Sequence, residues 1–250
     1  MKTIGVIPAR YKSTRLPAKP LADILGKPMV QHVYENASKA SCLDSVVVAT
    51  DDERIFAAVK AFGGMVVMTS PDHASGTDRV AEAAAASNAD LVVNVQGDEP
   101  LLDSVMIDEC VQGLKDALPY GDVGMSTVAK RIGEDAYQDP SVVKLVRDLR
   151  GRALYFSRSL IPYPQLRTPS FGVFEHIGLY AYTKDCLARL SSMPPGNLEQ
   201  IERLEQLRAL ENGIHIQVIE TKCEGELVSV DTLQDLERVR RILAANGAKG

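Results

Sequence analysis

The amino-acid sequence predicts an α/β protein with a mostly parallel central sheet flanked by helices and a smaller antiparallel part. In the first hundred residues, short apolar runs rich in Val and Ile alternate with helical stretches. Nearly continuous apolar runs are typical of strands buried on both faces, as in parallel sheets. From residue 123 onward, strand patterns instead follow one another across longer loops. This change of pattern predicts the antiparallel part.

Four strands and three helices are expected in the first half of the chain. Alternation of this kind implies right-handed crossover units and a doubly wound sheet. The run Asp51-Asp52-Glu53 supplies an amino-terminal cap and acidic residues for the first turn of the second helix. The strands are expected at residues 3–7, 45–49, 65–68 and 90–95, and the helices at 28–40, 53–62 and 77–87.

The second half of the chain is expected to be richer in strands. A helix is predicted to begin at Asn197, as its cap, and to stop at Asn212-Gly213. A closing amphipathic helix is expected at 232–245, and residues 1–250 contain no linker or internal repeat, so we expect a single domain. Pro162, Pro164 and Pro169 mark an irregular segment that would protrude or mediate assembly. The strands are expected at 123–129, 142–147, 153–156, 174–182 and 214–220.

The composition excludes several classes of protein. Of 250 residues, 45% are hydrophobic and 24% are charged, which is ordinary for a soluble globular protein. The formal net charge of −5 argues against a nucleic-acid-binding protein, which normally carries a basic excess. We find neither a membrane-spanning apolar run nor a signal peptide, so we expect a cytoplasmic protein without membrane insertion. The four cysteines lack the spacing of a zinc site.

The first predicted strand leads into a loop that carries four cations within ten residues. Arg10, Lys12, Arg15 and Lys19 would repel one another unless an anion lay among them. Loops at the carboxyl ends of strands are common ligand sites in open α/β sheets. Because the chain has neither the dinucleotide-binding glycine motif nor a P-loop, this loop would bind a polyphosphate through its own side chains and amides. A solvated charged face is the alternative interpretation.

Two acidic residues follow other apolar runs. Asp98 emerges after the strand expected at 90–95, at the same sheet edge as the cationic loop. A carboxylate there suits Mg²⁺, which prefers one or two carboxylates together with phosphate oxygens and water. A simple Gly-Asp turn is the alternative. Asp231 precedes the closing helix, where the residues alone favour a helix cap over a metal ligand.

Three further groups have both a functional and a structural interpretation. Residues 75–79 open the third helix, which suits an anion, a base edge or a plain cap. His176 and Tyr180 lie four apart on an expected strand, so they share a face; a core position is favoured over a pocket. Glu205 and Gln206 lie on an amphipathic helix, where a solvated face is the structural interpretation.

These motifs occur together in one known family. The chain resembles the 3-deoxy-manno-octulosonate cytidylyltransferases, also called CMP-Kdo synthetases, essentially from end to end. The family makes CMP-Kdo from CTP and 3-deoxy-manno-octulosonate (Kdo) for lipopolysaccharide, in the cytoplasm and usually as a homodimer. The motifs that carry the resemblance lie at residues 8–21, 26–29, 49–51, 75–79, 94–100, 153–158, 176–180, 204–208 and 230–232.

The resemblance implies a Rossmann-like nucleotidyltransferase fold and assigns roles to residues. Within the single domain, about 1–120 would mainly bind nucleotide, about 121–230 would mainly bind sugar and dimerise, and 231–250 would close the fold. Arg10, Lys19 and Asp98 would be catalytic, and Asp98 and Asp231 would hold Mg²⁺, which reverses the interpretation of Asp231 as a cap. The CTP-binding residues would be Pro8, Ala9, Arg10, Ser13, Arg15, Lys19, Ser75, Arg79 and Gln96. The Kdo-binding residues would be Gln96, Arg158, His176, Tyr180, Glu205 and Gln206.

The chain departs from the family pattern at two places. Ala74 stands where the family commonly has Gln, and Leu227-Val228-Ser229 replaces a glycine-rich approach to Asp231. A related branch of the family activates the 8-amino analogue of Kdo, so that sugar is an alternative substrate. A metal-dependent glycosyltransferase, and a sensor that binds CTP without consuming it, are alternatives from other functional classes.

Overall fold

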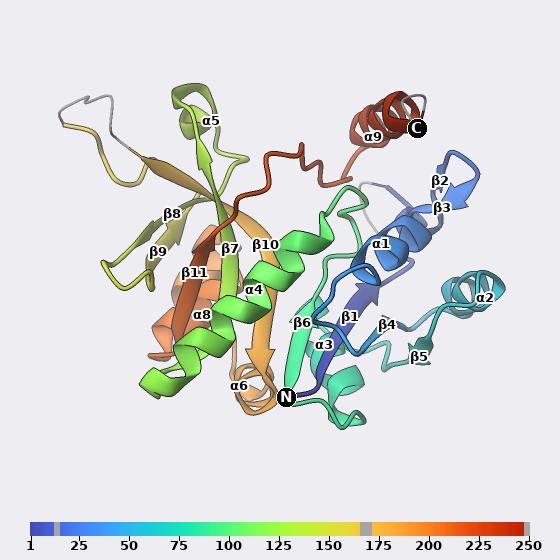
Figure 1. The fold of residues 1–250 in the computed structure, drawn as a ribbon, viewed down its shortest axis with the longest axis horizontal. Coiled ribbons are helices and arrows are strands. Elements are labelled where there is room, and N and C mark those ends of the chain that lie inside the picture. The colour runs from blue at the N-terminus through green and yellow to red at the C-terminus, as the bar shows by residue number, and fades with distance from the viewer. Residues whose placement is uncertain (13–15, 166–171, 248–250) are drawn as a thin grey trace. The chain divides into compact units, whose positions relative to one another are not determined.

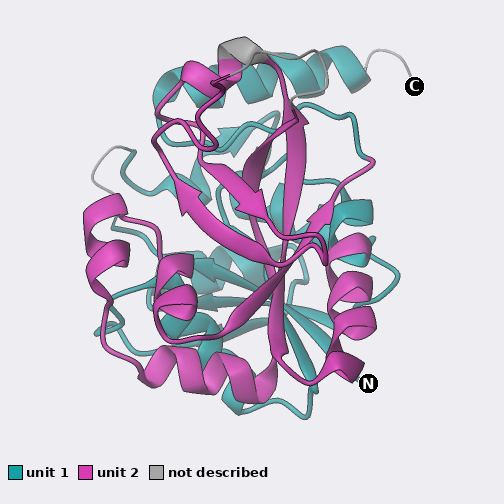
Figure 2. Ribbon diagram, turned by 90° about the vertical axis from the view of Figure 1, so that its left-hand side faces the viewer, with its two compact units in different colours: residues 1–108, 223–250 teal, residues 109–222 magenta. Residues whose placement is uncertain are grey.

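The chain divides into two compact units (Figure 2). One consists of residues 1–108 and 223–250, and the other of residues 109–222. The computed structural model describes residues 1–12, 16–165 and 172–247. The first unit therefore contains both ends of the described chain.

The sheet of the first unit is parallel, in the order β6–β1–β4–β5 (Figure 1). Ile4 of β1 pairs with Ser45 of β4, and Thr3 of β1 pairs with Leu91 of β6. The side chain of Val6, on the central strand β1, is fully buried. The parallel sheet expected from the apolar runs is confirmed. Its strands are β1 (Thr3–Ala9), β4 (Ser45–Thr50), β5 (Val66–Met68) and β6 (Leu91–Asn94).

The helices of this unit begin close to the predicted positions. The Asp52 carboxylate accepts a hydrogen bond from the Arg54 backbone N–H at 3.0 Å, which confirms the cap expected before the second helix. The closing helix packs Leu236 and Val239 into a buried apolar cluster that includes Met29, as its amphipathic pattern predicts. The helices are α1 (Met29–Ala37), α2 (Glu53–Ala61), α3 (Gly76–Ala85) and α9 (Leu233–Gly247).

Several elements have no counterpart in the prediction, among them a long helix and a short hairpin. Helix α4 (Ser104–Ala117) spans a stretch to which no element is assigned from the sequence, although its fully buried side chains follow helical spacing. A hairpin of β2 (Asp23–Ile24) and β3 (Lys27–Pro28) follows the single turn η1 (Lys19–Leu21). Leu25 (φ 52°) and Gly26 (φ 83°) both adopt the left-handed region, which two-residue hairpin turns require.

The second unit contains the antiparallel part of the fold. Strand β10 (Val173–Thr183) pairs antiparallel with both β7 (Val123–Ile132) and β8 (Lys144–Arg147). Strand β9 (Ala153–Ser157) is antiparallel to β8, and β11 (His215–Glu220) is parallel to β7. The smaller antiparallel part is therefore confirmed. The remaining elements are η2 (Leu118–Tyr120), α5 (Glu134–Gln138), α6 (Lys184–Ser192), α7 (Asn197–Glu202) and α8 (Gln206–Glu211).

The prediction of a single helix that begins at Asn197 is wrong. The chain forms two short helices, α7 and α8, and Arg203 between them adopts the left-handed region (φ 56°). The physical reason is a buried ion pair: Arg208 Nε lies 2.7 Å and Nη2 lies 2.5 Å from the Glu199 carboxylate oxygens, which holds α8 against α7. The cap is Gly196 rather than Asn197, and the Gly196 N–H donates to Glu199 at 3.0 Å.

The irregular segment expected around the prolines is present as far as the structure describes it. Residues 158–165 contain no helix or strand, and the Ile161–Pro162 peptide is cis. The Tyr137 hydroxyl donates to the Pro162 carbonyl. Pro169 lies outside the described residues.

The described helices are too short or too polar to cross a membrane. No helix within residues 1–12, 16–165 and 172–247 is long and apolar enough to span a bilayer.

Candidate functional site

One cation and two carboxylates meet within the first unit. Lys19 Nζ donates to Asp98 Oδ2 at 2.7 Å and to Asp231 Oδ1 at 3.1 Å. Lys19 starts η1, Asp98 follows β6, and Asp231 precedes α9. The Lys19 side chain is 15% exposed, and those of Asp98 and Asp231 are 26% and 32% exposed. The three charged groups therefore form a compact centre that a ligand can still reach.

The backbone holds both carboxylates in place. The Asp98 carbonyl accepts a hydrogen bond from the Val230 N–H at 2.9 Å, one residue before Asp231. Gly97 lies directly against the end of β1, because a Cβ at this position would be 2.7 Å from the Pro8 carbonyl oxygen. Such a distance excludes every side chain unless the backbone shifts. Close backbone packing therefore positions Asp98.

Asp231 is not the cap of α9. Thr232 precedes the first helical residue, and its Oγ1 accepts a hydrogen bond from the Asp235 N–H at 3.2 Å. The Asp235 carboxylate accepts in return from the Thr232 N–H at 2.8 Å. This reciprocal pair is a capping box. It leaves the Asp231 carboxylate directed at Lys19, so the cap interpretation that the residues alone favour is wrong.

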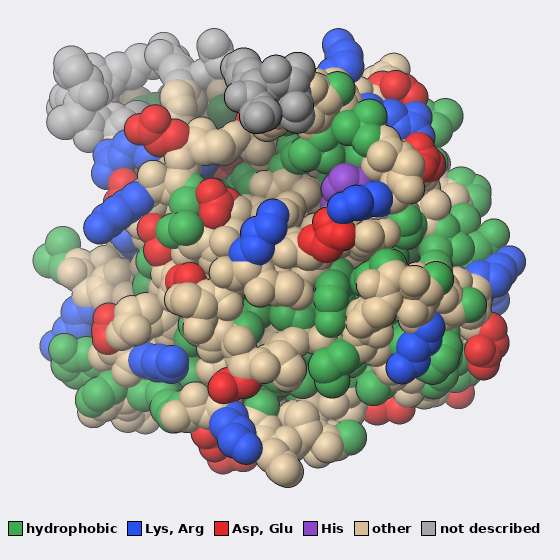
Figure 3. Space-filling model, turned by 45° about the vertical axis from the view of Figure 1, so that its right-hand side comes forward, with side chains coloured by type: hydrophobic (Ala, Val, Ile, Leu, Met, Phe, Trp, Pro, Cys, Tyr) green, Lys and Arg blue, Asp and Glu red, His purple; other side chains and the backbone are tan. Residues whose placement is uncertain are grey.

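The other cations predicted after β1 are placed differently from Lys19. Arg10 and Lys12 are exposed to solvent. Ser13 and Arg15 lie outside the described residues. Figure 3 shows basic and acidic side chains interspersed on one face of the protein. The described residues on that face form no continuous basic surface. Of the described loop cations, Lys19 is therefore the one that the structure brings onto the carboxylates.

The start of α3 lies against the end of β1. A Cβ on Gly76 would be 3.6 Å from Pro8 Cγ, and the neighbouring Ala9 is buried. Ser75 caps α3: its Oγ accepts from the Asp78 N–H at 3.2 Å, and its own N–H donates to the Asp78 carboxylate at 3.1 Å. The cap interpretation of Ser75 is confirmed, and its contact with CTP stays a prediction.

Two other predicted CTP-binding side chains have partners within the protein. Arg79 is only 4% exposed; it donates to Thr69 Oγ1 and pairs with Asp51 Oδ2 at 3.3 Å. The half-buried Gln96 donates from its amide to Asn94 Oδ1 at 3.3 Å. Arg79 thus stabilises the interior of the first unit, whatever its role toward a nucleotide.

A second cluster lies in the other unit, around His176 on β10. His176 Nε2 lies 3.0 Å from Thr127 Oγ1, and Nδ1 lies 3.5 Å from the amide nitrogen of Gln206. The rings of Phe156 and Tyr180 flank the imidazole, with centroid distances of 5.0 and 5.4 Å. Three predicted Kdo-binding residues, His176, Tyr180 and Gln206, are therefore brought together.

The hydrogen-bond network assigns one tautomer to His176. The Gln206 amide nitrogen can only donate, so Nδ1 accepts and the ring proton lies on Nε2. Nε2–H then donates to Thr127 Oγ1, whose own proton is donated to the Leu179 carbonyl at 2.8 Å. Burial disfavours the charged ring and lowers the pKa of His176 to about 3. His176 is therefore neutral at pH 7.

The Thr127 hydroxyl also contacts backbone carbonyls at an irregularity in β10. The pairing register of β10 with β7 shifts between Ile177 and Tyr180, which indicates a bulge. The Thr127 hydroxyl lies 3.2 Å from the Ile177 carbonyl and 2.8 Å from the Leu179 carbonyl. One buried hydroxyl thus contacts both the bulge and His176. Thr127 cannot be recognised from the sequence, because threonine is an ordinary strand residue and carries no further signal.

Tyr180 is kept protonated by its surroundings. Burial, and then the nearby charge of Glu205, raise the pKa of the Tyr180 phenol above its ordinary value. Glu205 is exposed at the start of α8, directly before the buried Gln206. Glu205 therefore belongs electrostatically to the His176 cluster, and the Tyr180 hydroxyl remains a hydrogen-bond donor at neutral pH.

Arg158 has a different set of contacts. Its Nε donates to the Glu202 carbonyl at 3.3 Å, and its Nη1 donates to the Pro140 carbonyl at 3.4 Å. Its backbone N–H donates to the Glu202 carboxylate at 3.1 Å. The buried ammonium of Lys144 donates to the Arg158 carbonyl at 2.6 Å. These contacts anchor Arg158 to the end of α7, and Lys144 is a second anchoring residue, one not predicted from the sequence.

The comparison with known proteins decides the family. The sequence profile of the cytidylyltransferases matches residues 4–217. The chain belongs to the cytidylyltransferase family. A 3-deoxy-manno-octulosonate cytidylyltransferase of Solibacter usitatus is 53% identical, with 100% of this chain and 97% of the relative covered. The relative of the same description from Syntrophotalea carbinolica is 51% identical, with 96% and 97% covered.

A solved structure agrees with this family. It is a CMP:2-keto-3-deoxy-manno-octonic acid synthetase complexed with CTP, 44% identical to the present cytidylyltransferase. The two superpose with a TM-score of 0.92, which covers 98% of this chain and 100% of the other. Both the resemblance drawn from the motifs and the nucleotidyltransferase fold that it implies are confirmed.

The carboxylates of Asp98 and Asp231 suit a divalent metal that takes its remaining ligands from substrate phosphates and water. Within the described part of the chain, no three His, Cys, Asp or Glu side chains gather into a metal site built by protein alone. Mg²⁺ does not require one, because one or two carboxylates usually hold it together with substrate phosphates and water. Asp98 and Asp231 already contact one cation, the Lys19 ammonium. The donor set therefore fits the predicted Mg²⁺.

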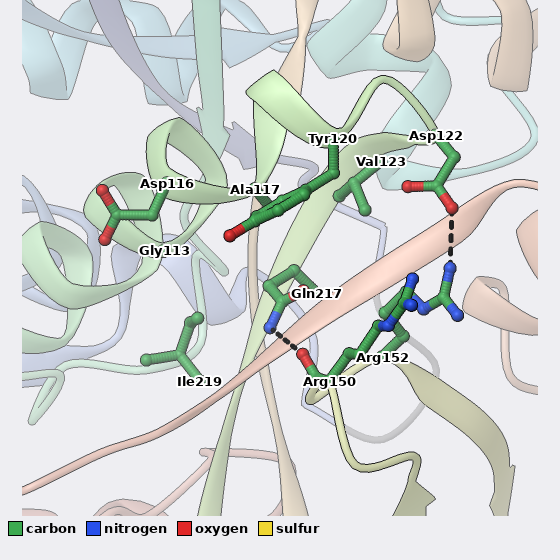
Figure 4. A pocket seen from close by; sticks show the side chains of 10 residues that line it. All are labelled: Gly113, Asp116, Ala117, Tyr120, Asp122, Val123, Arg150, Arg152, Gln217 and Ile219. Atoms are coloured by element: carbon green, nitrogen blue, oxygen red, sulfur yellow. Dashed lines mark hydrogen bonds and ion pairs between the residues drawn. The ribbon is translucent and has the colours of Figure 1, made fainter.

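A separate cavity of about 580 Å³ lies in the second unit of the cytidylyltransferase (Figure 4). On one side, Arg152 pairs with Asp122 at 2.6 Å, and the Gln217 amide donates to the Arg150 carbonyl at 3.2 Å. Tyr120 lines another side. None of its described lining residues is a predicted site residue.

Proposed function

We propose that this cytidylyltransferase transfers CMP from CTP to the anomeric hydroxyl of Kdo and releases pyrophosphate. The convergence of Lys19, Asp98 and Asp231 carries the proposal, because a metal-bound triphosphate needs a cation and carboxylates at one point. The relatives named for this sugar and the solved relative that holds CTP support the choice of substrates. The product, CMP-Kdo, is the activated sugar for lipopolysaccharide.

The reaction joins two anions, so neutralising charge is the first task of the protein. The sugar hydroxyl attacks the α-phosphorus in line, while the bond from that phosphorus to pyrophosphate breaks. Lys19 places positive charge at the bridge between the α- and β-phosphates, and the exposed Arg10 binds the triphosphate. Asp98 and Asp231 would hold Mg²⁺, which would supply Lewis-acid polarisation of the phosphoryl oxygen and of the attacking hydroxyl, whose proton is released to water.

The His176 cluster is assigned to the sugar. The Tyr180 phenol and the Gln206 amide offer the uncharged donors and acceptors that sugar hydroxyls require, and the neutral imidazole of His176 holds Gln206 beside them. Arg158, held by the Glu202 carbonyl, supplies the charge for the carboxylate of the sugar acid. His176 contributes hydrogen bonding rather than charge, because burial keeps it neutral.

Pyrophosphate release tests the reaction. The purified protein with CTP, Mg²⁺ and Kdo is expected to form CMP-Kdo and pyrophosphate in equal amounts. UTP in place of CTP tests the choice of base, and the 8-amino analogue of Kdo tests the choice of sugar. A glycosyltransferase would release no pyrophosphate from CTP, and a nucleotide sensor would leave CTP intact. Either result would overturn the proposal.

The metal is tested by chelation. EDTA is expected to abolish turnover, and Mg²⁺ added in excess is expected to restore it, because the two anionic substrates must be neutralised together. Far-UV circular dichroism in EDTA serves as the control for folding. Full turnover after exhaustive chelation would exclude the metal.

We further propose that the protein works as a cytoplasmic homodimer. Exposed apolar side chains in β9 and in the irregular segment that follows it support a self-association surface: Leu154 is 61% and Tyr163 is 80% exposed in the single chain. Free cysteines support a reducing compartment. Light scattering tests the dimer; the wild type is expected at twice the mass of one chain, and Leu154→Asp at the mass of one chain. A monomeric wild type would contradict it.

A further inference from the structure

We infer that Lys19 occupies the metal position while no nucleotide is bound, so that the divalent metal enters only when a triphosphate draws Lys19 away. The inference rests on the proposed function, because it concerns the metal and the nucleotide of that reaction. Its basis is one ammonium nitrogen that hydrogen-bonds both candidate metal ligands, at 2.7 Å to Asp98 and 3.1 Å to Asp231.

The ammonium and the metal compete for the same oxygens. Mg²⁺ binds oxygen at about 2.0–2.1 Å and requires octahedral surroundings. An ammonium that donates to both carboxylates fills the space between them and offsets their negative charge. A divalent ion placed there would also be repelled by the ammonium, strongly so at such short range and partial burial. The two cations therefore exclude one another.

The ammonium is the partner that can move. The Asp98 carbonyl is held by the Val230 N–H at 2.9 Å, and the Asp231 N–H is held by the Asp235 carboxylate at 3.1 Å. The carboxylates are thus attached to a fixed backbone. Lys19 also has a fixed backbone, in η1, but its charge sits at the end of a flexible four-carbon chain. Exchange of cations therefore requires only that the Lys19 side chain rotate away.

A triphosphate makes this exchange of Lys19 for the metal favourable, because it supplies new oxygen partners for both cations. Without it, an incoming metal gains only the carboxylates and must leave the Lys19 ammonium without its partners. With it, phosphate oxygens become ligands for the metal and acceptors for Lys19. Binding of metal and of nucleotide is therefore coupled, and by thermodynamic linkage each strengthens the other by the same factor.

Mn²⁺ binding to the nucleotide-free protein tests the inference. Free Mn²⁺ is measured by electron paramagnetic resonance for the wild type and for Lys19→Met, which keeps the length of the side chain and removes its charge. We expect Lys19→Met to bind Mn²⁺ about tenfold more tightly or better, within the range usual for coupled sites. Lys12→Met, which removes an equal charge from an exposed position, is expected to match the wild type.

Two further measurements locate the effect. Adding Asp98→Asn to Lys19→Met is expected to abolish the gain in Mn²⁺ affinity, because the gained site includes that carboxylate. In crystals of the wild type soaked in Mn²⁺ alone, anomalous scattering is expected to show no ion between Asp98 and Asp231. A soak with Mn²⁺ and a non-hydrolysable CTP analogue is expected to show the ion, with Lys19 turned toward phosphate.

The inference is overturned if folded Lys19→Met binds Mn²⁺ no more tightly than the wild type. It is also overturned if Mn²⁺ alone occupies the wild-type site while Lys19 keeps both hydrogen bonds, a measurement that needs no variant. Either failure would leave pyrophosphate release by the wild type intact. Failure of the proposed function would instead appear as no pyrophosphate from CTP and Kdo, so the two are distinguishable.

Discussion

The Thr127 hydroxyl lies 3.0 Å from His176 Nε2 and links the neutral imidazole to the bulge of β10. The same oxygen lies 2.8 Å from the Leu179 carbonyl, so one side chain contacts both the ring and the irregular part of the strand. Thr127 therefore contacts Nε2 and leaves Nδ1 of His176 for Gln206.

Replacing Thr127 by valine is expected to destabilise the fold and weaken Kdo binding. The variant leaves the His176 N–H and a buried carbonyl without partners, which costs about 1–3 kcal/mol for each unsatisfied group. The free energy of unfolding from urea titration measures the first effect. We expect KM for Kdo to rise while KM for CTP changes little, since the cluster is assigned to the sugar. Thr127→Ser keeps the hydroxyl and serves as control; equal KM shifts for both substrates in Thr127→Val would contradict the assignment.

Acid is expected to destabilise the protein through His176. Its pKa is lowered from 6.5 to about 3 in the folded state, so between these values the unfolded chain binds a proton that the folded protein does not. Stability is therefore lost as pH falls below about 6.5, by up to about 1.4 kcal/mol per pH unit. Unfolding in urea at about pH 7.5 and about pH 5 should show the wild type losing about 2 kcal/mol more than His176→Gln. Equal losses in the two proteins would refute the shifted pKa.

Asp98→Asn is expected to remove turnover and keep the fold. Asparagine preserves the shape but loses the charge that faces Lys19 and that the proposed metal would require. Loss of one such contact typically lowers kcat by about a hundredfold to a thousandfold. Turnover and circular dichroism are compared with Asp72→Asn, a change of the same kind at an exposed aspartate. Turnover of Asp98→Asn near that of the wild type would exclude its metal role.

Gly97→Ala tests whether backbone packing positions Asp98. The new methyl group would be 2.7 Å from the Pro8 carbonyl oxygen, so the loop must shift and take Asp98 with it. We expect turnover to fall by about tenfold or more, since small misplacements at a reacting centre are costly. At Gly225 no atom lies within 4 Å of an added Cβ, so Gly225→Ala is the matched control. A similar, small effect of both substitutions on turnover would contradict the packing argument.

The Glu199–Arg208 pair is expected to dominate the stability of the α7–α8 region. Both residues are 7% exposed, so Arg208→Met leaves a buried carboxylate uncompensated at a cost of about 3–5 kcal/mol. The exposed pair of Arg238 with Glu226 provides the contrast. Arg238→Met should cost no more than about 1 kcal/mol. Urea unfolding of the two variants measures the difference, and comparable losses would show that burial of the pair is unimportant.

Much of the fold follows from short-range pattern. The strands and helices of the first unit could be predicted because apolar runs and helical spacing are properties of adjacent residues. The break at Arg203 could not, because its cause is a side-chain pair that forms only when α8 packs on α7. Helix α4 carries an apolar stripe at helical spacing, so the sequence contains enough information to predict this helix as well.

Some residues of the candidate site could likewise be predicted from the sequence, and others could not. The motif at residues 94–100 indicates Asp98 from the sequence, since acidic residues after a buried strand are recognisable. Asp231 is different: its neighbours favour a helix cap, and the deciding contact is with Lys19, 212 residues away. Thr127 carries no signal at all, because its partners are backbone carbonyls and a ring on another strand.

The sequence by itself determined the α/β class, the parallel sheet of the first unit and, through its motifs, the family. These depend on residue types and spacings that any chain of this pattern would share. Only the tertiary structure decided that Lys19 bridges Asp98 and Asp231, that Thr232 rather than Asp231 caps α9, and that His176 is neutral. Those outcomes depend on hydrogen bonds and burial between residues far apart in the chain, which local pattern does not encode.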